Sequence, residues 1–219
     1  MKKILIAIVS VLFFSASASA LEVRVGLSAA ATAVEIEGTE TLKSTSVKTK
    51  ANEDAYMIVP SVFAELAHSS GLGLGIDYVT VNTADLGSDS RDREDDETGQ
   101  GVSRAGAEIK DIFNVYAIFT LGETGLYVKA GQAFANIDTQ ETLTTGTKYG
   151  NKDIEGLIYG AGYNFDIGGS GFFGRVEATM TDFDNVKFTG TKDTTTNTSN
   201  TVTADLDAYQ ARVSIGKSF

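Results

Sequence analysis

The amino-acid sequence predicts an all-β protein: a closed, eight-stranded, antiparallel up-and-down transmembrane β-barrel. Three observations indicate this fold class. An export signal opens the chain, eight later runs alternate apolar with polar or small residues, and short turns alternate strictly with long polar connections. Together these features place one compact β domain after a segment that is removed during export.

The first 20 residues form a signal peptide, not part of the fold. The Lys2-Lys3 pair precedes an almost unbroken apolar run over 4–14, and Ala18-Ser19-Ala20 matches the small-residue pattern of a signal-peptidase site. The run is shorter than the roughly 20 residues of a membrane-spanning helix. A buried N-terminal helix is the alternative. We therefore predict Sec export, cleavage before Leu21 and a barrel domain over 21–219.

Composition excludes several other classes of protein. Loss of Lys2 and Lys3 changes the net charge from −11 to −13, so the mature chain lacks the basic clusters that bind nucleic acid. The chain has no cysteine, which excludes disulfides and thiolate metal sites. We expect no cofactor. No second apolar stretch is long enough for a membrane helix, but membrane strands carry a much weaker signal.

The mature chain alternates strand-like runs with connections of two lengths. The runs lie at 21–36, 55–68, 71–82, 105–121, 125–137, 154–167, 171–184 and 206–219. Three connections are short and glycine-rich, as in hairpins: 68–71, 121–125 and 168–171. Four are long and polar: 37–54, 83–104, 138–153 and 185–205. In an up-and-down sheet this order puts all long loops at one end, as in outer-membrane barrels with both termini in the periplasm.

The last run shows the period-two pattern best. Apolar side chains share one face, with Lys217 near its end: Tyr209, Ala211, Val213, Ile215 and Phe219. A soluble barrel or sandwich would bury this face. The opposite faces of several strands are rich in glycine, however, which suits the crowded lumen of a narrow barrel. Ten steps of about 3.4 Å at a tilt near 45° also rise about 24 Å, close to the apolar band of a membrane barrel.

If the apolar face meets lipid, the charges within the strands face the lumen. They are Glu22, Arg24, Glu65, Asp77, Glu108, Lys110, Lys129, Arg175, Glu177 and Arg212. Acids and bases balance, and an eight-stranded barrel is just wide enough for side chains to fill. Buried charges persist only when paired, so we expect a salt-bridged plug, with Arg212 and Arg24 adjacent and Glu22 or Glu177 as partners. The alternative is a narrow polar conduit for small ions.

Several short motifs resemble the small outer-membrane barrels of Gram-negative bacteria, the OmpA membrane domain, OmpX and the broader "porin family". They are Tyr127-Val128-Lys129-Ala130-Gly131, Gly160-Ala161-Gly162-Tyr163, Arg175-Val176-Glu177 and the closing run 209–219. The resemblance implies a place in the cell outer membrane, contact with its lipid and lipopolysaccharide, and passage through periplasmic chaperones. It also implies that the barrel-assembly machinery reads an assembly signal at the end of the chain: Tyr209, Val213, Ile215 and Phe219.

No motif indicates catalysis or a metal site. The chain has one histidine, His68, followed by two serines in a short connection, and we interpret it as an ordinary turn residue. The acidic run 92–97 lacks the spacing of a calcium loop and contains Arg93, so we expect a solvated charge run. The Thr/Asn-rich stretch 194–203 is typical of a flexible external loop.

The sequence therefore predicts a non-enzymatic outer-membrane protein with a structural or surface-exposed function and a largely plugged lumen. Two alternatives stay open. One is a small porin-like channel for ions or small solutes, and the other is an adhesin or ligand receptor that works through its external loops. The sequence leaves the oligomeric state open.

Overall fold

The computed structural model describes residues 21–42, 45–80, 84–93, 101–142, 148–191 and 199–219, with the backbone alone for 84–93, 101–105 and 141–142. The strands are β1 (Leu21–Thr41), β2 (Lys48–His68), β3 (Leu72–Val79), β4 (Ala84–Arg93), β5 (Gly101–Thr120), β6 (Leu126–Thr142), β7 (Lys152–Asp166), β8 (Phe172–Thr189) and β9 (Thr201–Ser218). Within these ranges, no helix is long and apolar enough to cross a membrane.

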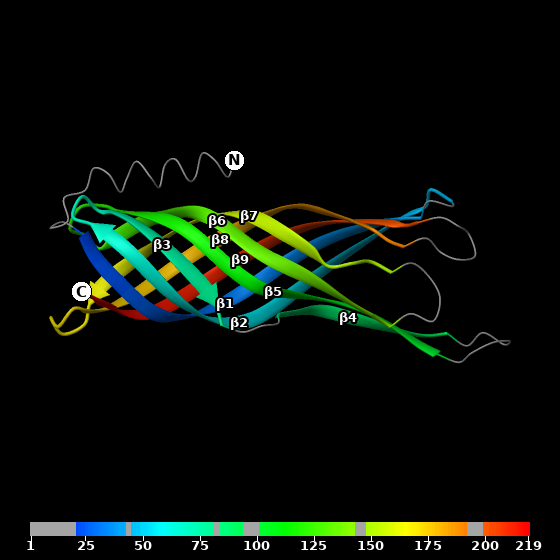
Figure 1. The fold of residues 1–219 in the computed structure, drawn as a ribbon, viewed down its shortest axis with the longest axis horizontal. Coiled ribbons are helices and arrows are strands. Elements are labelled where there is room, and N and C mark those ends of the chain that lie inside the picture. Colours follow the sequence, from blue (N-terminus) through cyan, green and yellow to red (C-terminus); the bar gives the residue numbers. More distant parts are fainter. Residues whose placement is uncertain (1–20, 43–44, 81–83, 94–100, 143–147, 192–198) are drawn as a thin grey trace.

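The strands form an antiparallel ring (Figure 1). The order is β3-β2-β1-β9-β8-β7-β6-β5, and a ladder between β3 and β5 closes it. β4 pairs with β5 beyond the end of β3, so β3 and β4 are successive pieces of the third of eight ring positions. The first and last strands meet at a seam, where Val23 and Phe219 exchange backbone hydrogen bonds of 3.2 and 2.9 Å. The prediction of a closed eight-stranded barrel is confirmed.

The strands are longer than predicted at the end away from the three short turns. β1 and β2 pair out to Thr41 and Lys48, although 37–54 was expected to be a loop. Strand residues also occupy parts of the other three expected loops. In these extensions the outward faces are polar and the apolar residues point inward, as Val202 and Ala204 on β9 do. The alternation therefore changes phase, and polarity on the outer face alone does not end a ladder. The third ring strand differs too: β2 pairs with β3 only up to Ser61 opposite Val79, next to Pro60.

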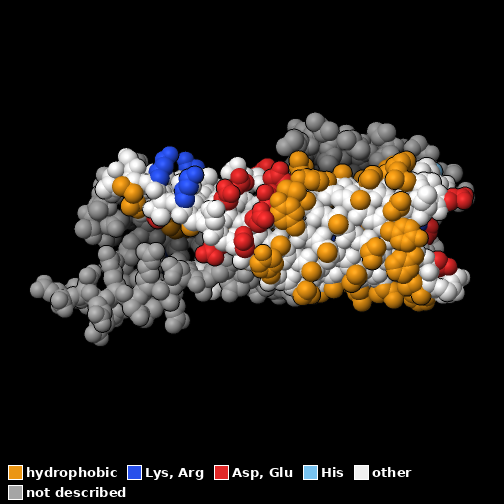
Figure 2. All heavy atoms as spheres, turned by 180° about the vertical axis from the view of Figure 1, so that it is seen from behind, with side chains coloured by type: hydrophobic (Ala, Val, Ile, Leu, Met, Phe, Trp, Pro, Cys, Tyr) orange, Lys and Arg blue, Asp and Glu red, His pale blue; other side chains and the backbone are white. Residues whose placement is uncertain are grey.

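Two zones follow each other along the barrel. The proximal zone starts at the short turns, and its outward side chains are apolar, among them Val25, Leu27, Val128, Val176, Val213 and Ile215. The distal zone begins at Glu35 on β1 and includes 201–207 on β9. A buried apolar cluster lies inside the barrel in this zone and extends across the boundary into the proximal zone. It is formed by Val34, Ile109, Ala133, Ala135, Ile137, Ile154, Ile158, Phe183, Val186, Leu206 and Ala208. Figure 2 shows hydrophobic side chains gathered over one half of the visible face, with acidic side chains at their border.

Glycines on the inner face make room for large side chains of the neighbouring strands. Gly75 lies opposite Tyr116 and Gly162 opposite Tyr127. A Cβ atom at Gly75 would lie 2.5 Å from the Tyr116 ring, and one at Gly162 would lie 2.3 Å from the Tyr127 hydroxyl. The glycine-rich inner face therefore lets aromatic rings lie flat across the barrel wall.

A buried charge network as the candidate functional site

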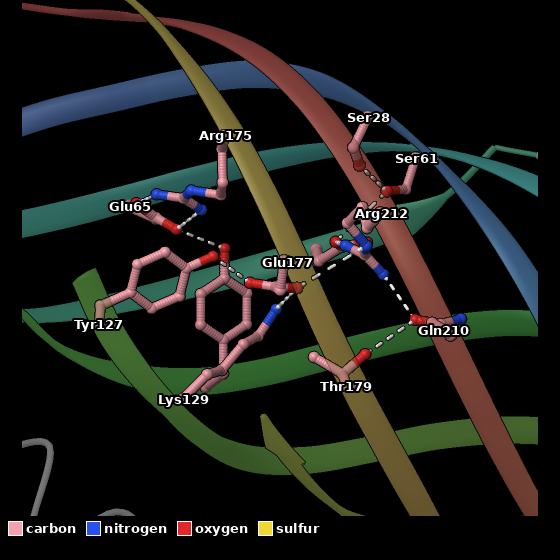
Figure 3. A network of polar contacts seen from close by, with 12 residues as sticks. Ser28, Ser61, Glu65, Tyr127, Lys129, Arg175, Glu177, Thr179, Gln210 and Arg212 are labelled. Atoms are coloured by element: carbon pink, nitrogen blue, oxygen red, sulfur yellow. Dashed lines mark hydrogen bonds and ion pairs between the residues drawn. The ribbon is translucent and has the colours of Figure 1, made fainter. Parts of the chain in front are cut away.

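Six charged side chains meet inside the proximal zone. Each is at most 6% exposed, and acids and bases balance: Glu65, Asp77 and Glu177 with Lys129, Arg175 and Arg212. They come from β2, β3, β6, β8 and β9, and neutral partners come from β1, β5 and β7. Every ring position therefore contributes a side chain, so the network crosses the whole lumen (Figure 3).

The best-satisfied pair is Glu65 with Arg175. Arg175 Nη1 and Nη2 donate to the two oxygens of Glu65 over 2.5 and 2.8 Å, and Arg175 Nε donates to Asn164 over 2.7 Å. The Tyr116 hydroxyl donates to Glu65 over 2.8 Å. The rings of Phe63, Tyr127 and Phe173 lie 5.1, 5.2 and 5.5 Å from the guanidinium carbon. This two-pronged geometry, with aromatic faces around the cation, satisfies both oxygens of the buried carboxylate and stabilises the guanidinium.

A second group connects β3, β6, β8 and β9. Lys129 Nζ donates to Glu177 over 2.9 Å and lies 3.9 Å from the centre of the Tyr116 ring. The Tyr127 hydroxyl donates to the other Glu177 oxygen over 2.6 Å. Arg212 pairs with Asp77, and its Nε lies 3.9 Å from Glu177. The two groups are thus joined through shared aromatic residues into one network.

The Asp77–Arg212 pair is the less complete part of this network. Asp77 Oδ1 and Arg212 Nε are the two buried side-chain atoms of the described residues that lack a hydrogen-bond partner. Ser61 donates to the other Asp77 oxygen over 3.3 Å, and Gln210 accepts from Arg212 over 3.0 Å. A buried polar atom without a partner costs free energy, so this pair should be the easier one to separate.

Four predicted lumen residues lie elsewhere. Glu22 and Arg24 pair with each other over 3.1 Å and line a vestibule of about 540 Å³ at the turn end of the barrel. Arg24 is not beside Arg212, because the register places Ala30 opposite Arg212 and Ser218 opposite Arg24. The expectation that these two arginines are adjacent is therefore wrong.

Glu108 and Lys110 lie on the outer face, contrary to expectation. They alternate with Ile109, which is buried in the apolar cluster inside the distal zone. Glu108 lies opposite Asp138, and Lys110 forms an ion pair with Asp138 on that same outer face. The physical reason is the reversal of the pattern beyond the apolar band, where the inner face is apolar and the outer face is polar.

Sequence reasoning missed the neutral members of the network. Tyr116 was not singled out, and Tyr127 was named only within a motif of the family resemblance, not as a lumen residue. Tyr127 nevertheless stands two residues before Lys129 and therefore on the same face. An aromatic hydroxyl in phase with charged residues is the signal that could have identified it. Asn164 and Gln210 carry the same kind of signal, because each alternates with outward apolar residues.

The remaining residues considered in the sequence analysis lie outside the charge network. His68 lies in the first short turn, where Nδ1 is 2.9 Å from the Ser70 hydroxyl. Within the described ranges, no group of three or more His, Cys, Asp or Glu residues is arranged to hold a metal ion. Most of the acidic run 92–97, half of 194–203 and the signal peptide lie outside the described residues. Tyr209, Val213, Ile215 and Phe219 are exposed on the outer face, and their function in assembly stays a prediction.

The lumen changes character along its length. Above the network lies a small cavity of about 40 Å³, lined in part by Asn114, Lys129 and Arg212. That volume holds only a few water molecules. Farther out, a second cavity of about 250 Å³ opens among apolar side chains of the distal zone. The charge network is therefore the barrier between the vestibule and the distal interior.

Solved structures share this architecture. The outer-membrane protease OmpT from Escherichia coli aligns with a TM-score of 0.54 and 10% identity, over 90% of this chain and 97% of that one. The outer-membrane protein OprG from Pseudomonas aeruginosa aligns at 0.56 and 9%, over 91% and 96%. The outer-membrane protein AlkL aligns at 0.54 and 11%, over 94% and 93%. Neither a family model nor a curated protein sequence matches the chain. The fold is that of an outer-membrane β-barrel.

Proposed function

We propose that the chain is an integral outer-membrane protein whose barrel is a closed, non-conducting scaffold that presents a protein surface outside the membrane. One observation carries the proposal: the charge network takes side chains from all eight ring positions and leaves a cavity of about 40 Å³ above it. Leaving one buried charge without its partner costs about 3–5 kcal/mol, so states in which these charges are separated inside the lumen would be rare. On this proposal the barrel is not an enzyme.

Single-channel recording of the refolded protein in planar bilayers tests this proposal. The wild-type protein should give no stable conductance steps. Replacing both Glu65 and Arg175 by glycine removes the bulk of the pair and should produce small steps. The matched control replaces the outward pair Lys110 and Asp138 by glycine and should stay silent. Stable steps from the wild-type protein, unchanged in the Glu65/Arg175 variant, would overturn the closed-barrel proposal.

The channel alternative has one observation in its favour, the incomplete Asp77–Arg212 pair. If the network gates a conduit, it should open there first. Asp77→Asn should then give conductance while Glu65→Gln does not. Loop-mediated binding stays a prediction, because the described residues leave out parts of every distal connection.

A further inference from the structure

The distal zone contains a partly open pocket that is separate from the charge network. It has a volume of about 250 Å³, and inward side chains from β1, β5, β6, β8 and β9 line it, including Ile36, Ala107, Ile137, Phe188, Val202 and Leu206. Apolar side chains dominate this lining, which continues the buried cluster inside the barrel. A cavity of this kind gives water few hydrogen-bond partners and therefore favours apolar contents.

Tyr149 crosses the outer end of this pocket. Its backbone oxygen accepts a hydrogen bond of 2.7 Å from Thr139 on β6, while its hydroxyl lies 3.2 Å from Glu40 on β1. These two strands lie on opposite sides of the ring, separated by β7, β8 and β9. Asn200 also donates to Glu40, over 3.3 Å. The Tyr149 ring thus lines the pocket and partly closes it.

The charges around the rim limit what can enter. Glu53, opposite Ile36 on the neighbouring strand, is part of the lining, and Glu40 stands at the mouth. An anionic ligand would be repelled by both carboxylates. The bases of the network below are already paired. Lys152 Nζ lies 5.9 Å from the Phe188 ring of the lining, but it already donates to the backbone oxygen of Lys187 over 2.7 Å and is therefore not free to pair with an anion. The site therefore favours a neutral ligand.

The volume sets the size of that ligand. A cavity of about 150 Å³ is enough for benzene, and sites for drug-sized molecules begin near 300 Å³. We propose that the distal pocket binds one small, neutral, apolar molecule, the size of a substituted aromatic ring or a short hydrocarbon chain, beneath Tyr149. This binding activity is additional to the scaffold function and does not need a conducting lumen.

Toluene and benzoate are matched probes for this proposal. The protein, labelled with ¹³C in its Ile, Leu and Val methyl groups, is refolded in lipid nanodiscs and titrated while methyl shifts are recorded. Toluene should shift Ile36, Ile137 and Leu206 along a saturating curve. The lipid-facing methyls of Val213 and Ile215 should change only in proportion to the toluene dissolved in the lipid. Benzoate should produce no saturating shift.

Variants locate the site. Ala204→Phe fills the pocket and should abolish the saturating shift, whereas Ala211→Phe, on the lipid-facing side of the same strand, should keep it. Ala107→Leu is a second filling variant, in case Ala204→Phe does not fold. Tyr149→Phe loses the hydroxyl contact to Glu40 and should weaken toluene binding by roughly two- to tenfold. Proportional, non-saturating shifts at both sets of methyls would overturn the proposal, as would saturation that survives both filling variants. Equal saturation by benzoate would overturn the assignment to neutral ligands.

Discussion

On β9, the outward residues change from Val213 and Ile215 in the proximal zone to Asp205 and Asp207 in the distal zone. The inward residues change in the opposite sense, from Arg212 to Leu206. The hydrogen-bonded ladder runs through both zones without interruption on this strand's β1 side. One continuous strand therefore carries two opposite patterns of polarity.

The difference teaches that the medium outside the barrel, not the strand geometry, determines which side chains lie inside. In the distal zone the outer face is polar, and apolar side chains collect inside as in a soluble barrel. In the proximal zone the apolar face meets lipid, and polar side chains inside must satisfy one another. Stability should accordingly depend on ion pairs in the proximal zone and on packing in the distal zone.

The largest expected effect is the loss of one partner of a proximal pair. Glu65→Leu leaves Arg175 buried without its acid, and it should lower the free energy of unfolding by about 3–5 kcal/mol. The double variant Glu65→Leu/Arg175→Leu should recover most of that loss, because it leaves no unpaired charge. Urea unfolding of protein refolded in lipid vesicles measures the double-mutant cycle.

The control for this cycle is the outward distal pair. Lys110→Ala should change the urea midpoint little, because this outward pair is partly exposed to solvent and such pairs contribute little. If the Glu65 and Arg175 effects were simply additive, the pair would be solvated, and the proposed distinction between the zones would fail.

The second effect concerns packing in the distal zone. Ile154 is 4% exposed inside the apolar cluster, whereas Ile215 is 53% exposed on the lipid-facing surface. Ile154→Ala loses the transfer free energy of the removed carbons and also leaves a cavity. It should therefore lower the free energy of unfolding by about 3–4 kcal/mol. Ile215→Ala should cost only about 1–2 kcal/mol, because lipid chains fill the vacated space. Equal losses in vesicle unfolding experiments would mean that the distal interior is loosely packed.

The difference between the two zones also explains which features of the fold and the site the sequence could predict. Alternation and turn chemistry predicted the closed ring and the three short turns, which require only local pattern. Alternation alone does not show which face lies inside. Glu108 and Lys110 were therefore assigned to the lumen, although the interior of the barrel is already apolar at their level. Pairing partners were missed for another reason. Glu65 on β2 reaches Arg175 on β8 across two intervening strands, β1 and β9. Such contacts depend on the stagger of the strands, which no local pattern encodes.

The third effect concerns the inner-face glycines of the proximal zone, which leave room for the large aromatic rings opposite them. Gly162→Ala places a methyl group against the Tyr127 hydroxyl and should displace that ring from Glu177, at about 1–3 kcal/mol. The same substitution in a Tyr127→Ala background should be nearly neutral, because the ring is gone. Gly38→Ala, whose added Cβ would lie 3.5 Å from the nearest atom, is the distal control and should change little. A full loss in the Tyr127→Ala background would show that the backbone, not the ring, requires glycine.

The smallest effect lies at the boundary between the zones, where acids on neighbouring strands face each other. Asp207 lies opposite both Glu35 and Asp182. Burial raises the pKa of the Asp207 carboxyl above its ordinary value of 3.8, and the charges of Asp182, Asp205 and Glu37 raise it further. The folded protein therefore holds this proton more tightly than the unfolded chain does. The resulting stabilisation is present at low pH and is lost as the pH rises through the raised pKa.

Asp207→Asn should consequently raise the free energy of unfolding at pH 7, measured with urea, by less than about 1 kcal/mol because the site is largely solvated. The difference from the wild-type protein should shrink as the pH falls below 4. At pH 7, 1 M salt should reduce the part of this stability difference that comes from repulsion by the neighbouring acids. The part that comes from burial of the carboxylate should remain. The measurements need a chelator, since a divalent cation between the acids would stabilise the charged form. A wild-type protein more stable than Asp207→Asn at pH 7 under these conditions would mean that Asp207 has a favourable partner, and that the boundary acids do not repel one another.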